Sequence, residues 1–392
     1  MSAIALVDMG DLAPYAGRER IVEIRPYTET LWVKWDDGHE ARFSWIWLRD
    51  HCACAACRHP TTRERLFELY DLSLPLAAPR VLLEPEGALQ LRWQKDGQEE
   101  HVTRYDPAWL RRRAYEPAHA QNGPHEGWDA SMAGRLPRFN FDEVQERGDA
   151  LRNWIQALLQ HGVALISGAP ARPGELARFA ESIAPIYETN FGRIFDVQSK
   201  PNPNNAAYTS LGLELHVDLP NHPSPPDIQL LFCIANEAEG GDSTLADGLW
   251  IAERLRKEAP QDFQVLTTLP IDFRFQDAEV DIRFKTPLIE LSPQGDFIGI
   301  RFNNWIRDSL LLPPEEVETF YRAYQRLWKE LRDERNHIQL RLQAGDLLAF
   351  DNRRVLHGRT AFTATGARHL QGCYLQRSMV ESRLRILERN AK

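Results

Sequence analysis

Short runs of alternating hydrophobic and polar residues fill the chain from about residue 20 to residue 113. The segments IVEIRPY, TLWVKWDD, ALQLRWQKDGQ and HVTRY have the period of two that is typical of half-buried β-strands, and Gly and Asp separate them. The pattern predicts a small β-rich domain over residues 18–113.

The same region contains a weak internal repeat. Residues 39–48 (HEARFSWIWL) and residues 101–110 (HVTRYDPAWL) both fit the pattern H-x-x-R-[FY]-[SD]-x-x-W-L. Each copy predicts a strand followed by a short turn whose Trp-Leu pair covers the core. Two copies are too few for a solenoid, so we expect one domain with two pseudo-symmetric halves.

The pattern changes after residue 113. Residues 114–137 contain several Pro, Gly and small residues without periodicity, which predicts a linker. A second domain is expected over residues 138–392, opening with one amphipathic helix over FDEVQERGDALRNWIQALLQHG. Beyond residue 205 strand-like apolar runs outnumber helical ones, so we predict a mainly β domain with helices, either a sandwich or a jelly roll.

Composition narrows the possible functions. The chain has 392 residues and a formal net charge of −9, which argues against nucleic acid or a membrane surface as a partner. No apolar run approaches the ~18 residues that span a bilayer, and the N-terminus lacks a basic signal region. The five cysteines are odd in number and mostly clustered, so we expect free thiols and a cytoplasmic location.

The strongest chemical signal combines the segments ELHVDLP and FDNRRVLHGRT. His216 and Asp218 are two residues apart, so on a strand they project from the same face. Together with His357 they provide the two imidazoles and one carboxylate of the non-haem Fe(II) facial triad. Arg368, in ATGARHLQG, adds a guanidinium that is suited to a bidentate clamp on a dicarboxylate.

Two other histidines compete for the position of third iron ligand. His222 lies in the Pro-rich segment PNHPSPP, and His337 lies at the predicted end of a helix. Both surroundings favour a surface position over a place at a buried metal.

The segment WLRDHCACAACRH poses a separate question. A catalytic thiol does not need three neighbouring cysteines, and a redox pair favours a thioredoxin-like βαβ pattern that the chain lacks. Three cysteines provide most of a closed tetrahedral zinc site. These are Cys52, Cys54 and Cys57.

The fourth zinc ligand stays open on the residues alone. The candidates are His39, His51, His59 and His101. His51 adjoins Cys52 and is poorly placed to converge on the same ion. His39 and His101 occupy equivalent places in the two half-repeats, so the pattern does not separate them.

Several segments together resemble the γ-butyrobetaine dioxygenase family, a branch of the taurine-dioxygenase-like Fe(II)/2-oxoglutarate oxygenases. In the second domain they are NNAAYTSLGLELHVDLP, GGDSTLADG, FDNRRVLHGR and ARHLQGCYLQRSMVESRLRIL. In the first they are WLRDHCxCxxC and HVTRYDPAWL, so the resemblance covers nearly the whole chain. The Cys-rich first domain distinguishes this branch from plain taurine dioxygenases.

The resemblance implies a double-stranded β-helix, or jelly roll, that binds Fe(II) through His216, Asp218 and His357. It assigns the C5 carboxylate of the co-substrate 2-oxoglutarate to Arg368, with Ser243 as a hydroxyl partner. It also implies a structural Zn²⁺ held by the three cysteines and His101, O2 as the second co-substrate, ascorbate as reductant, and a homodimer.

The resemblance further implies hydroxylation of γ-butyrobetaine to L-carnitine, a reaction of carnitine biosynthesis. Aromatic ring faces recognise a trimethylammonium group. The family's substrate positions match Phe191, Phe195, Asn205, Tyr208, Asn303 and Tyr374.

Three positions depart from the family pattern. Phe191 and Phe195 replace Tyr and Trp, and Leu219 replaces a Tyr near the substrate. The alternatives are therefore a sister dioxygenase acting on trimethyllysine or on a betaine phosphonate or sulfonate, and a non-catalytic zinc-scaffold interaction protein.

Overall fold

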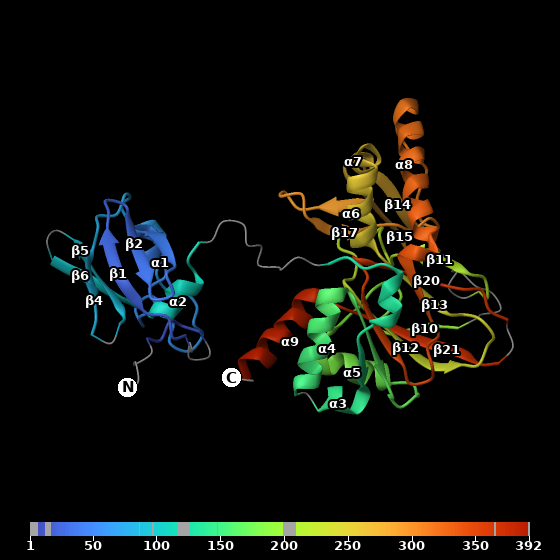
Figure 1. Cartoon of the computed structure of the whole chain (residues 1–392), viewed down its shortest axis with the longest axis horizontal. Helices are drawn as coiled ribbons and strands as arrows, with labels where there is room; N and C mark the ends of the chain where they lie inside the picture. The colour runs from blue at the N-terminus through green and yellow to red at the C-terminus, as the bar shows by residue number, and fades with distance from the viewer. Residues whose placement is uncertain are drawn as a thin grey trace. The chain divides into compact units, whose positions relative to one another are not determined.

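The computed structural model describes residues 7–11, 17–85, 87–95, 98–115, 126–146, 148–198, 209–363 and 366–390. The chain divides into two compact units, Met1–Gly123 and Pro124–Lys392 (Figure 1). Two residues of the expected substrate site, Asn205 and Tyr208, lie outside the described residues.

The smaller unit consists of two similar halves. Each half is a three-stranded antiparallel sheet followed by a short helix. The first comprises β1 (Ile21–Pro26), β2 (Thr30–Trp35), β3 (Glu40–Ser44) and α1 (Trp45–Asp50). The second comprises β4 (Arg80–Leu83), β5 (Leu89–Lys95), β6 (Gln98–Tyr105) and α2 (Pro107–Arg112), and a 3₁₀ turn, η1 (Leu69–Asp71), lies between the halves in sequence.

A short helix replaces the turn that we expected at the end of each repeat. The helices begin at equivalent N-caps, because the Ser44 side chain accepts from the Trp47 backbone N–H and Asp106 accepts from those of Ala108 and Trp109. Side-chain acceptors at this position satisfy N–H groups that the first helical turn leaves unpaired. The repeat in the sequence thus corresponds to a repeat in the structure.

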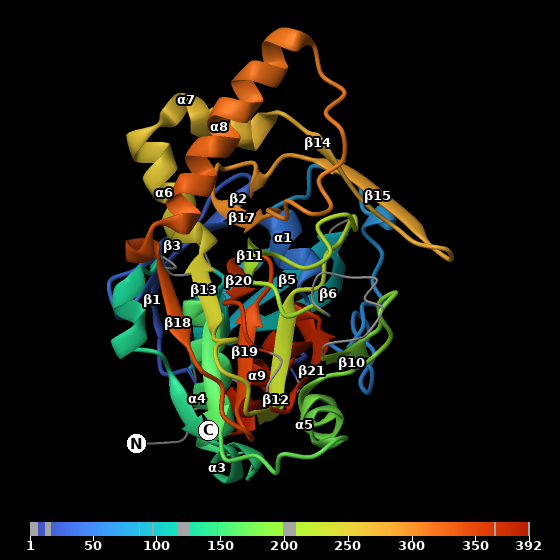
Figure 2. The ribbon, with the colours of Figure 1, turned by 90° about the vertical axis from the view of Figure 1, so that its right-hand side faces the viewer.

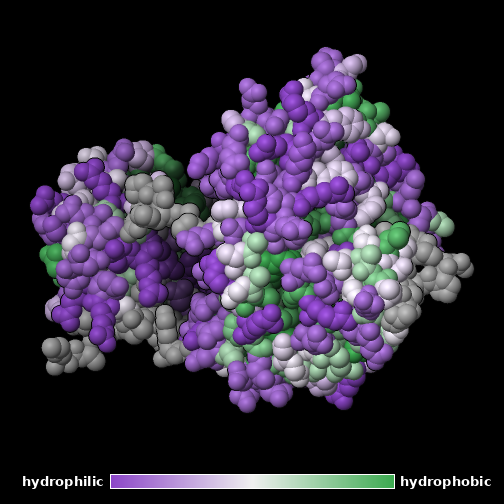
Figure 3. Space-filling view, turned by 45° about the vertical axis from the view of Figure 1, so that its right-hand side comes forward, coloured by the Kyte–Doolittle hydropathy of each residue, from purple (hydrophilic) through white to green (hydrophobic). Residues whose placement is uncertain are grey.

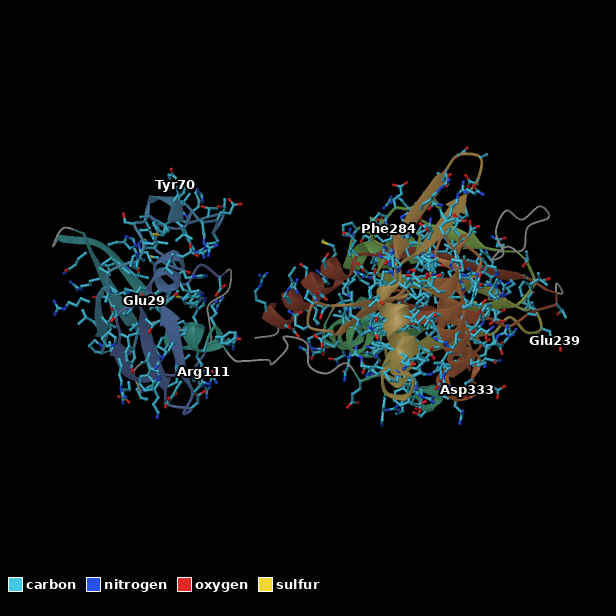
Figure 4. The ribbon with its side chains drawn as sticks, turned by 90° about the horizontal axis from the view of Figure 1, so that it is seen from above. Glu29, Tyr70, Arg111, Glu239, Phe284 and Asp333 are labelled. Carbon is cyan, nitrogen blue, oxygen red and sulfur yellow. The ribbon has the colours of Figure 1, made fainter. Side chains whose placement is uncertain are left out.

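The two halves share one core. Trp35 Nε1 donates to the backbone O of Pro107 at 2.9 Å in a buried position, and the Tyr105 hydroxyl donates to the backbone O of Leu48. Arg111 extends from α2 at the surface (Figure 4). Its Nε lies 2.8 Å from Asp37 Oδ2 in the turn after β2. Each contact joins one half to the other.

The described part of the larger unit contains two large β-sheets and two two-stranded hairpins (Figure 2). The seven-stranded sheet has the order β10-β21-β12-β19-β8-β7, with β9 beside β21. Its strands are β7 (Arg138–Asn140), β8 (Val163–Ser167), β9 (Ile186–Tyr187), β10 (Phe195–Val197), β12 (Ile228–Asn236), β19 (Leu347–Asp351) and β21 (Arg368–Leu375). The four-stranded sheet has the order β11 (Leu213–His216), β20 (Val355–Arg359), β13 (Ser243–Asp247) and β18 (His337–Leu340).

The alternation of side chains along β8 shows how the layers are built. Val163 and Leu165 pack in a cluster with residues from both sheets, so the sheets face each other across a core. Ala164 and Ile166 point the other way and pack against helices. The expected mainly β fold with helices, of the jelly-roll type, is confirmed.

Helices cover the outer face of each sheet. Four pack on the seven-stranded sheet: α3 (Phe141–Gln145), α4 (Asp149–His161), α5 (Glu175–Ile183) and α9 (Arg377–Asn390). The other sheet is covered by α6 (Gly248–Glu258), α7 (Pro260–Thr268), α8 (Pro314–Arg332) and the hairpins β14 (Ile271–Gln276)–β15 (Asp281–Thr286) and β16 (Ile289–Leu291)–β17 (Phe297–Ile300).

Two expectations about the start of this unit are wrong. The single helix expected over FDEVQERGDALRNWIQALLQHG is two helices, α3 and α4, and Gly148 caps α4 with a non-helical backbone. The second part of the expected linker 114–137 belongs to the folded unit. It includes the turns η2 (Ala130–Gly134) and buries Trp128, Met132 and Leu136, because these apolar residues fill one end of the core between the sheets.

All five cysteines are free. Among the described helices, none has the length and apolar character needed to cross a membrane. The face of the molecule seen in Figure 3 is mostly hydrophilic, with hydrophobic residues in several smaller areas.

Candidate functional site

Pairing of β11 with β20 builds the centre of the site. His216, at the end of β11, lies opposite His357 in the antiparallel register, and the two ring centroids are 4.3 Å apart. Asp218 follows β11, and its Oδ1 lies 3.5 Å from His216 Nε2 and 3.8 Å from His357 Nε2. Within the described part of the chain these three residues form a possible metal-binding group that excludes His222 and His337.

Neighbouring groups fix the orientation of these side chains. His216 Nδ1 lies 2.9 Å from the backbone O of Glu214, which leaves Nε2 free to bind a metal. Tyr374 donates its hydroxyl to Asp218 Oδ2 at 2.7 Å. The Asn352 side chain accepts from the backbone N–H of Asp218 at 2.7 Å and donates to its backbone O at 3.0 Å.

The protonation states suit metal binding. Burial opposes ionisation of Asp218, but the nearby His357 and the hydrogen bonds from His216 and Tyr374 outweigh it and hold the pKa of that carboxyl well below its usual range. Burial, with the nearby His216, lowers the pKa of His357 to about 3. An ionised carboxylate and a neutral imidazole, as at Asp218 and His357, are the forms that bind a divalent cation.

The turn after Asp218 is unusual. Leu219 has a φ of +55°, a left-handed conformation that is uncommon for a residue other than glycine. Arg301, which is buried, holds the turn by donating from Nη1 to the carbonyls of Pro220 at 2.9 Å and His222 at 2.6 Å, and from Nη2 to that of Pro223 at 3.0 Å. This arrangement fixes the direction in which the chain leaves Asp218.

The triad lies in a cavity of about 320 Å³ with an aromatic wall. The rings of Phe195 and Tyr374 are 5.2 Å apart at 33°, and Phe191 lies edge-on to Phe275 at 5.6 Å. Trp305 lines the same cavity with its ring 4.9 Å from that of His216. The structure therefore brings three of the expected cage residues together with the triad.

Sequence reasoning missed two members of this wall. Phe275 belongs to β14, which reads simply as an apolar strand, and Trp305 stands two residues after Asn303 in RFNNWIR. The position of Trp305 beside a predicted substrate residue was the one available signal.

The expected co-substrate residues also line the cavity. Arg368 begins β21, and its Nη2 lies 3.3 Å from the backbone O of Gly241. Burial lowers the pKa of Arg368, and among the described residues no carboxylate forms an ion pair with it. A half-buried guanidinium that has no such ion pair among the described residues favours an anionic ligand. Ser243 lines the same cavity and is buried.

Asn303 lines the cavity as well, but its side chain also has local partners. Its Nδ2 donates to the backbone O of Val217 at 3.2 Å, and its Oδ1 accepts from the backbone N–H of Trp305 at 3.1 Å. Asn303 thus connects the aromatic wall to the strand that leads into Asp218.

The smaller unit brings its own metal-ligating group together. The His101 Nε2 lies 3.2, 3.7 and 3.5 Å from the Sγ atoms of Cys52, Cys54 and Cys57. Ligands at the edges of a tetrahedral zinc site with ordinary Zn–S and Zn–N bonds are about 3.6 Å apart, so the four residues fit one Zn²⁺. Arg49 Nη1 lies 3.3 Å from Cys57 Sγ, where its charge favours the thiolate.

The competing histidines have other neighbours. His51 Nδ1 lies 2.8 Å from the backbone O of Trp47, and its ring stacks on that indole at 4.2 Å. His59 Nδ1 accepts from the backbone N–H groups of Thr61 and Thr62. His39 lies beside Trp35 and is not among the four residues that converge.

Residues 120–374, well over half of the chain, match the family model "Taurine catabolism dioxygenase TauD, TfdA family". The chain belongs to this dioxygenase family. Residues 22–111 of this TauD/TfdA-family protein match a second model, "Gamma-butyrobetaine hydroxylase-like, N-terminal". The expected resemblance is confirmed in both units.

Curated relatives agree over nearly the full length of this TauD/TfdA-family dioxygenase. The γ-butyrobetaine dioxygenase of Pseudomonas sp. (strain AK-1) is 38% identical over 363 residues, which cover 91% of this chain and 93% of the relative. The Homo sapiens γ-butyrobetaine dioxygenase is 30% identical over 377 residues (92% and 95%). The mitochondrial trimethyllysine dioxygenase of Bos taurus is 32% identical over 373 residues (91% and 87%).

Proposed function

We propose that this dioxygenase hydroxylates γ-butyrobetaine to L-carnitine with Fe(II), 2-oxoglutarate and O2. The observation that carries the proposal is the shared cavity, which contains the His216, Asp218 and His357 triad, the half-buried Arg368 and the aromatic wall. The names of relatives that are 38% and 30% identical over more than nine-tenths of the chain support the same substrate.

An Fe(II) ion held by the triad would supply the activation of O2, with 2-oxoglutarate as the co-substrate that is oxidised. The chain itself does the positioning. Arg368 binds the far carboxylate of 2-oxoglutarate, assisted by the Ser243 hydroxyl. Tyr374 and Asn352 keep Asp218 in place, and the apolar walls exclude water from the reacting centre.

The betaine headgroup binds against the rings. Phe191, Phe195 and Tyr374 present aromatic surface in the cavity, and each cation–π contact contributes roughly 0.5–2 kcal/mol. Tyr208, Asn205 and Asn303 complete the proposed substrate contacts. Leu219 also lines the cavity and offers no hydroxyl to the substrate. At this position the enzyme therefore selects the substrate by its shape and by its contacts with the aromatic rings.

The remaining parts of the proposal follow the family resemblance. Residues 18–113 form the zinc-binding domain, and residues 138–392 together with the packed segment 126–137 form the catalytic domain. Cys52, Cys54, Cys57 and His101 hold a structural Zn²⁺. Ascorbate is the proposed reductant that keeps the iron in its ferrous form. We also propose a homodimer in the cytoplasm, with neither nucleic acid nor membrane as a partner.

A second candidate substrate is trimethyllysine, because a trimethyllysine dioxygenase is 32% identical over most of the chain. The deciding experiment offers γ-butyrobetaine, trimethyllysine, and betaine phosphonates and sulfonates to the enzyme with Fe(II), 2-oxoglutarate, ascorbate and O2. Mass spectrometry identifies the compound that gains one oxygen atom, and a succinate assay measures co-substrate turnover.

Incorporation of oxygen into γ-butyrobetaine with the highest kcat/KM supports the proposal. Preferred oxidation of another compound overturns the substrate and keeps the reaction class. If none of the compounds is oxidised and no succinate forms in protein with its iron bound, the non-catalytic zinc scaffold is the better interpretation.

A further inference from the structure

We propose that Gly372 is a specificity-determining positioning residue, which sets the width of the headgroup site by giving the Phe195 ring room to lie against strand β21. This inference rests on the proposed function, because it concerns the recognition of the substrate headgroup.

The two residues face each other across a strand pair. β10 pairs with β21 in an antiparallel register that places Phe195 opposite Gly372. A Cβ atom built on Gly372 would lie 2.3 Å from Cζ and 2.4 Å from Cε2 of Phe195. Carbon atoms in contact are ordinarily about 3.5–4.0 Å apart. The ring therefore occupies the space that any other side chain at position 372 would need.

The requirement for glycine here is steric and does not arise from the backbone. Gly372 lies inside β21 and is absent from the residues with positive φ, so its conformation is one that alanine adopts readily. An alanine at position 372 would conflict with the Phe195 ring and would leave the strand pairing possible.

The ring cannot escape by sliding along β21. Asp196, the next residue of β10, is tied to β21 at two points, with His369 Nε2 at 2.7 Å from its Oδ1 and Gln371 Nε2 donating to the same oxygen at 3.0 Å. These contacts hold the register of the strand that carries Phe195. A larger residue at 372 must therefore push the ring away from β21.

That direction leads into the substrate cavity. Residues 372 and 374 project from the same face of β21, and the Phe195 ring lies beside that of Tyr374, whose hydroxyl is bonded to Asp218. Both rings line the cavity. Restoring ordinary contact with an alanine methyl would move the Phe195 ring by roughly 1 Å or more into this space.

A narrower headgroup site should discriminate between substrates by the size of their headgroups. A trimethylammonium group fills the site from several directions, whereas an N,N-dimethylammonium group has one methyl fewer. We expect Gly372→Ala to lower kcat/KM for γ-butyrobetaine about tenfold relative to kcat/KM for 4-(dimethylamino)butyrate, the size of effect that one methyl group produces in a tight pocket.

The experiment measures kcat and KM for both compounds, and KM for 2-oxoglutarate, in the full-length iron- and zinc-loaded enzyme. The variants are Gly372→Ala, Phe195→Leu and the double variant. Gly134→Ala is the matched control, because a Cβ at that glycine meets no atom within 4 Å. The wild-type rate with γ-butyrobetaine tests the proposed function by itself. If a different betaine is the substrate, the same comparison is made with that compound and its dimethyl analogue.

A fall in the trimethyl-to-dimethyl ratio in Gly372→Ala, with KM for 2-oxoglutarate unchanged and the ratio recovered in the double variant, supports the inference. An unchanged ratio, an equal loss for both compounds, or a loss that Phe195→Leu does not relieve overturns it. If Gly372→Ala fails to fold and the double variant folds, the conflict is with Phe195 as proposed. If neither folds, position 372 has a role beyond Phe195 and the inference fails.

Discussion

The side-chain amide of Asn352 is hydrogen-bonded to both backbone groups of Asp218, a residue 134 positions earlier in the chain. Asn352 Nδ2 also donates to the backbone O of Pro226 at 3.0 Å. The fully buried side chain of Asn352 therefore fixes the backbone of Asp218.

Replacing Asn352 with alanine should weaken Fe(II) binding about 10- to 100-fold, which is the usual cost of losing a group that orients a metal ligand. Activity at limiting iron should fall in parallel. Iron titration of the apo enzyme provides the measurement. Asn336→Ala is the control, since Asn336 is equally buried but bonds to Glu330 and not to an iron ligand. Equal loss of iron affinity in both variants would contradict the role assigned to Asn352.

Tyr374→Phe separates two functions of one side chain. The ring that faces the substrate cavity is kept, and the hydrogen bond to Asp218 Oδ2 is lost. KM for the betaine should change little, while Fe(II) affinity should fall about tenfold.

The same variant should shift the pH profile. The pKa of Asp218 is depressed, so its ionised, metal-binding form is present at neutral pH and is lost as the pH falls through that pKa. Removing the Tyr374 hydroxyl removes a group that lowers this pKa, so the acid limb of kcat/KM should move to higher pH. A shift to lower pH, or an increase in betaine KM with iron affinity intact, would contradict the assignment.

Arg301→Met tests the turn that follows Asp218. The substitution leaves three backbone carbonyls without this donor and removes one partner of the Glu290 carboxylate. We expect a loss of about 3 kcal/mol in unfolding free energy for a broken buried ion pair, together with weaker iron binding. Urea denaturation measures the first effect. Arg283→Met, at an exposed ion pair with Asp281, should leave the urea midpoint unchanged.

Much of the triad site could be predicted from the types and order of its residues in the sequence. His216, Asp218 and His357 are recognisable because the chemistry demands those residue types, and the antiparallel pairing of β11 and β20 explains how so distant a histidine reaches the other two. The cysteine cluster is local, so three of its four ligands are visible without any fold.

The residues that support the site could not be predicted from the sequence in this way. Arg301 and Asn352 bond to backbone groups far away in the sequence, and Gly372 lies against the ring of Phe195, so nothing in the residues that adjoin them in the sequence indicates a partner. Phe275 and Trp305 face the cavity only because β14 and the segment around residue 305 fold over it. The apolar residues near Trp128 were misread as linker because they lack periodicity and fill a gap at the end of a core.

The two metal sites should fail independently. Cys54→Ser should lose zinc and lower the thermal stability of the smaller unit, since a structural metal contributes its binding energy to folding. Asp218→Ala should abolish turnover with zinc content unchanged. Elemental analysis, calorimetry and a succinate assay distinguish these outcomes. Loss of activity in Cys54→Ser protein with full zinc and an unchanged melting profile would refute a structural role for the cluster.

The position of His101 gives the zinc site a further consequence. The cysteines follow the first repeat and the histidine lies in the second, 44 residues beyond Cys57, so one bound ion ties the two halves together. A cross-link that closes a loop of this length restricts the unfolded chain and, on the chain-entropy account used for disulfides, favours the folded state by about 4 kcal/mol. The unit thus obtains the benefit of a covalent bridge in a form that reducing conditions leave intact and that a chelator can remove.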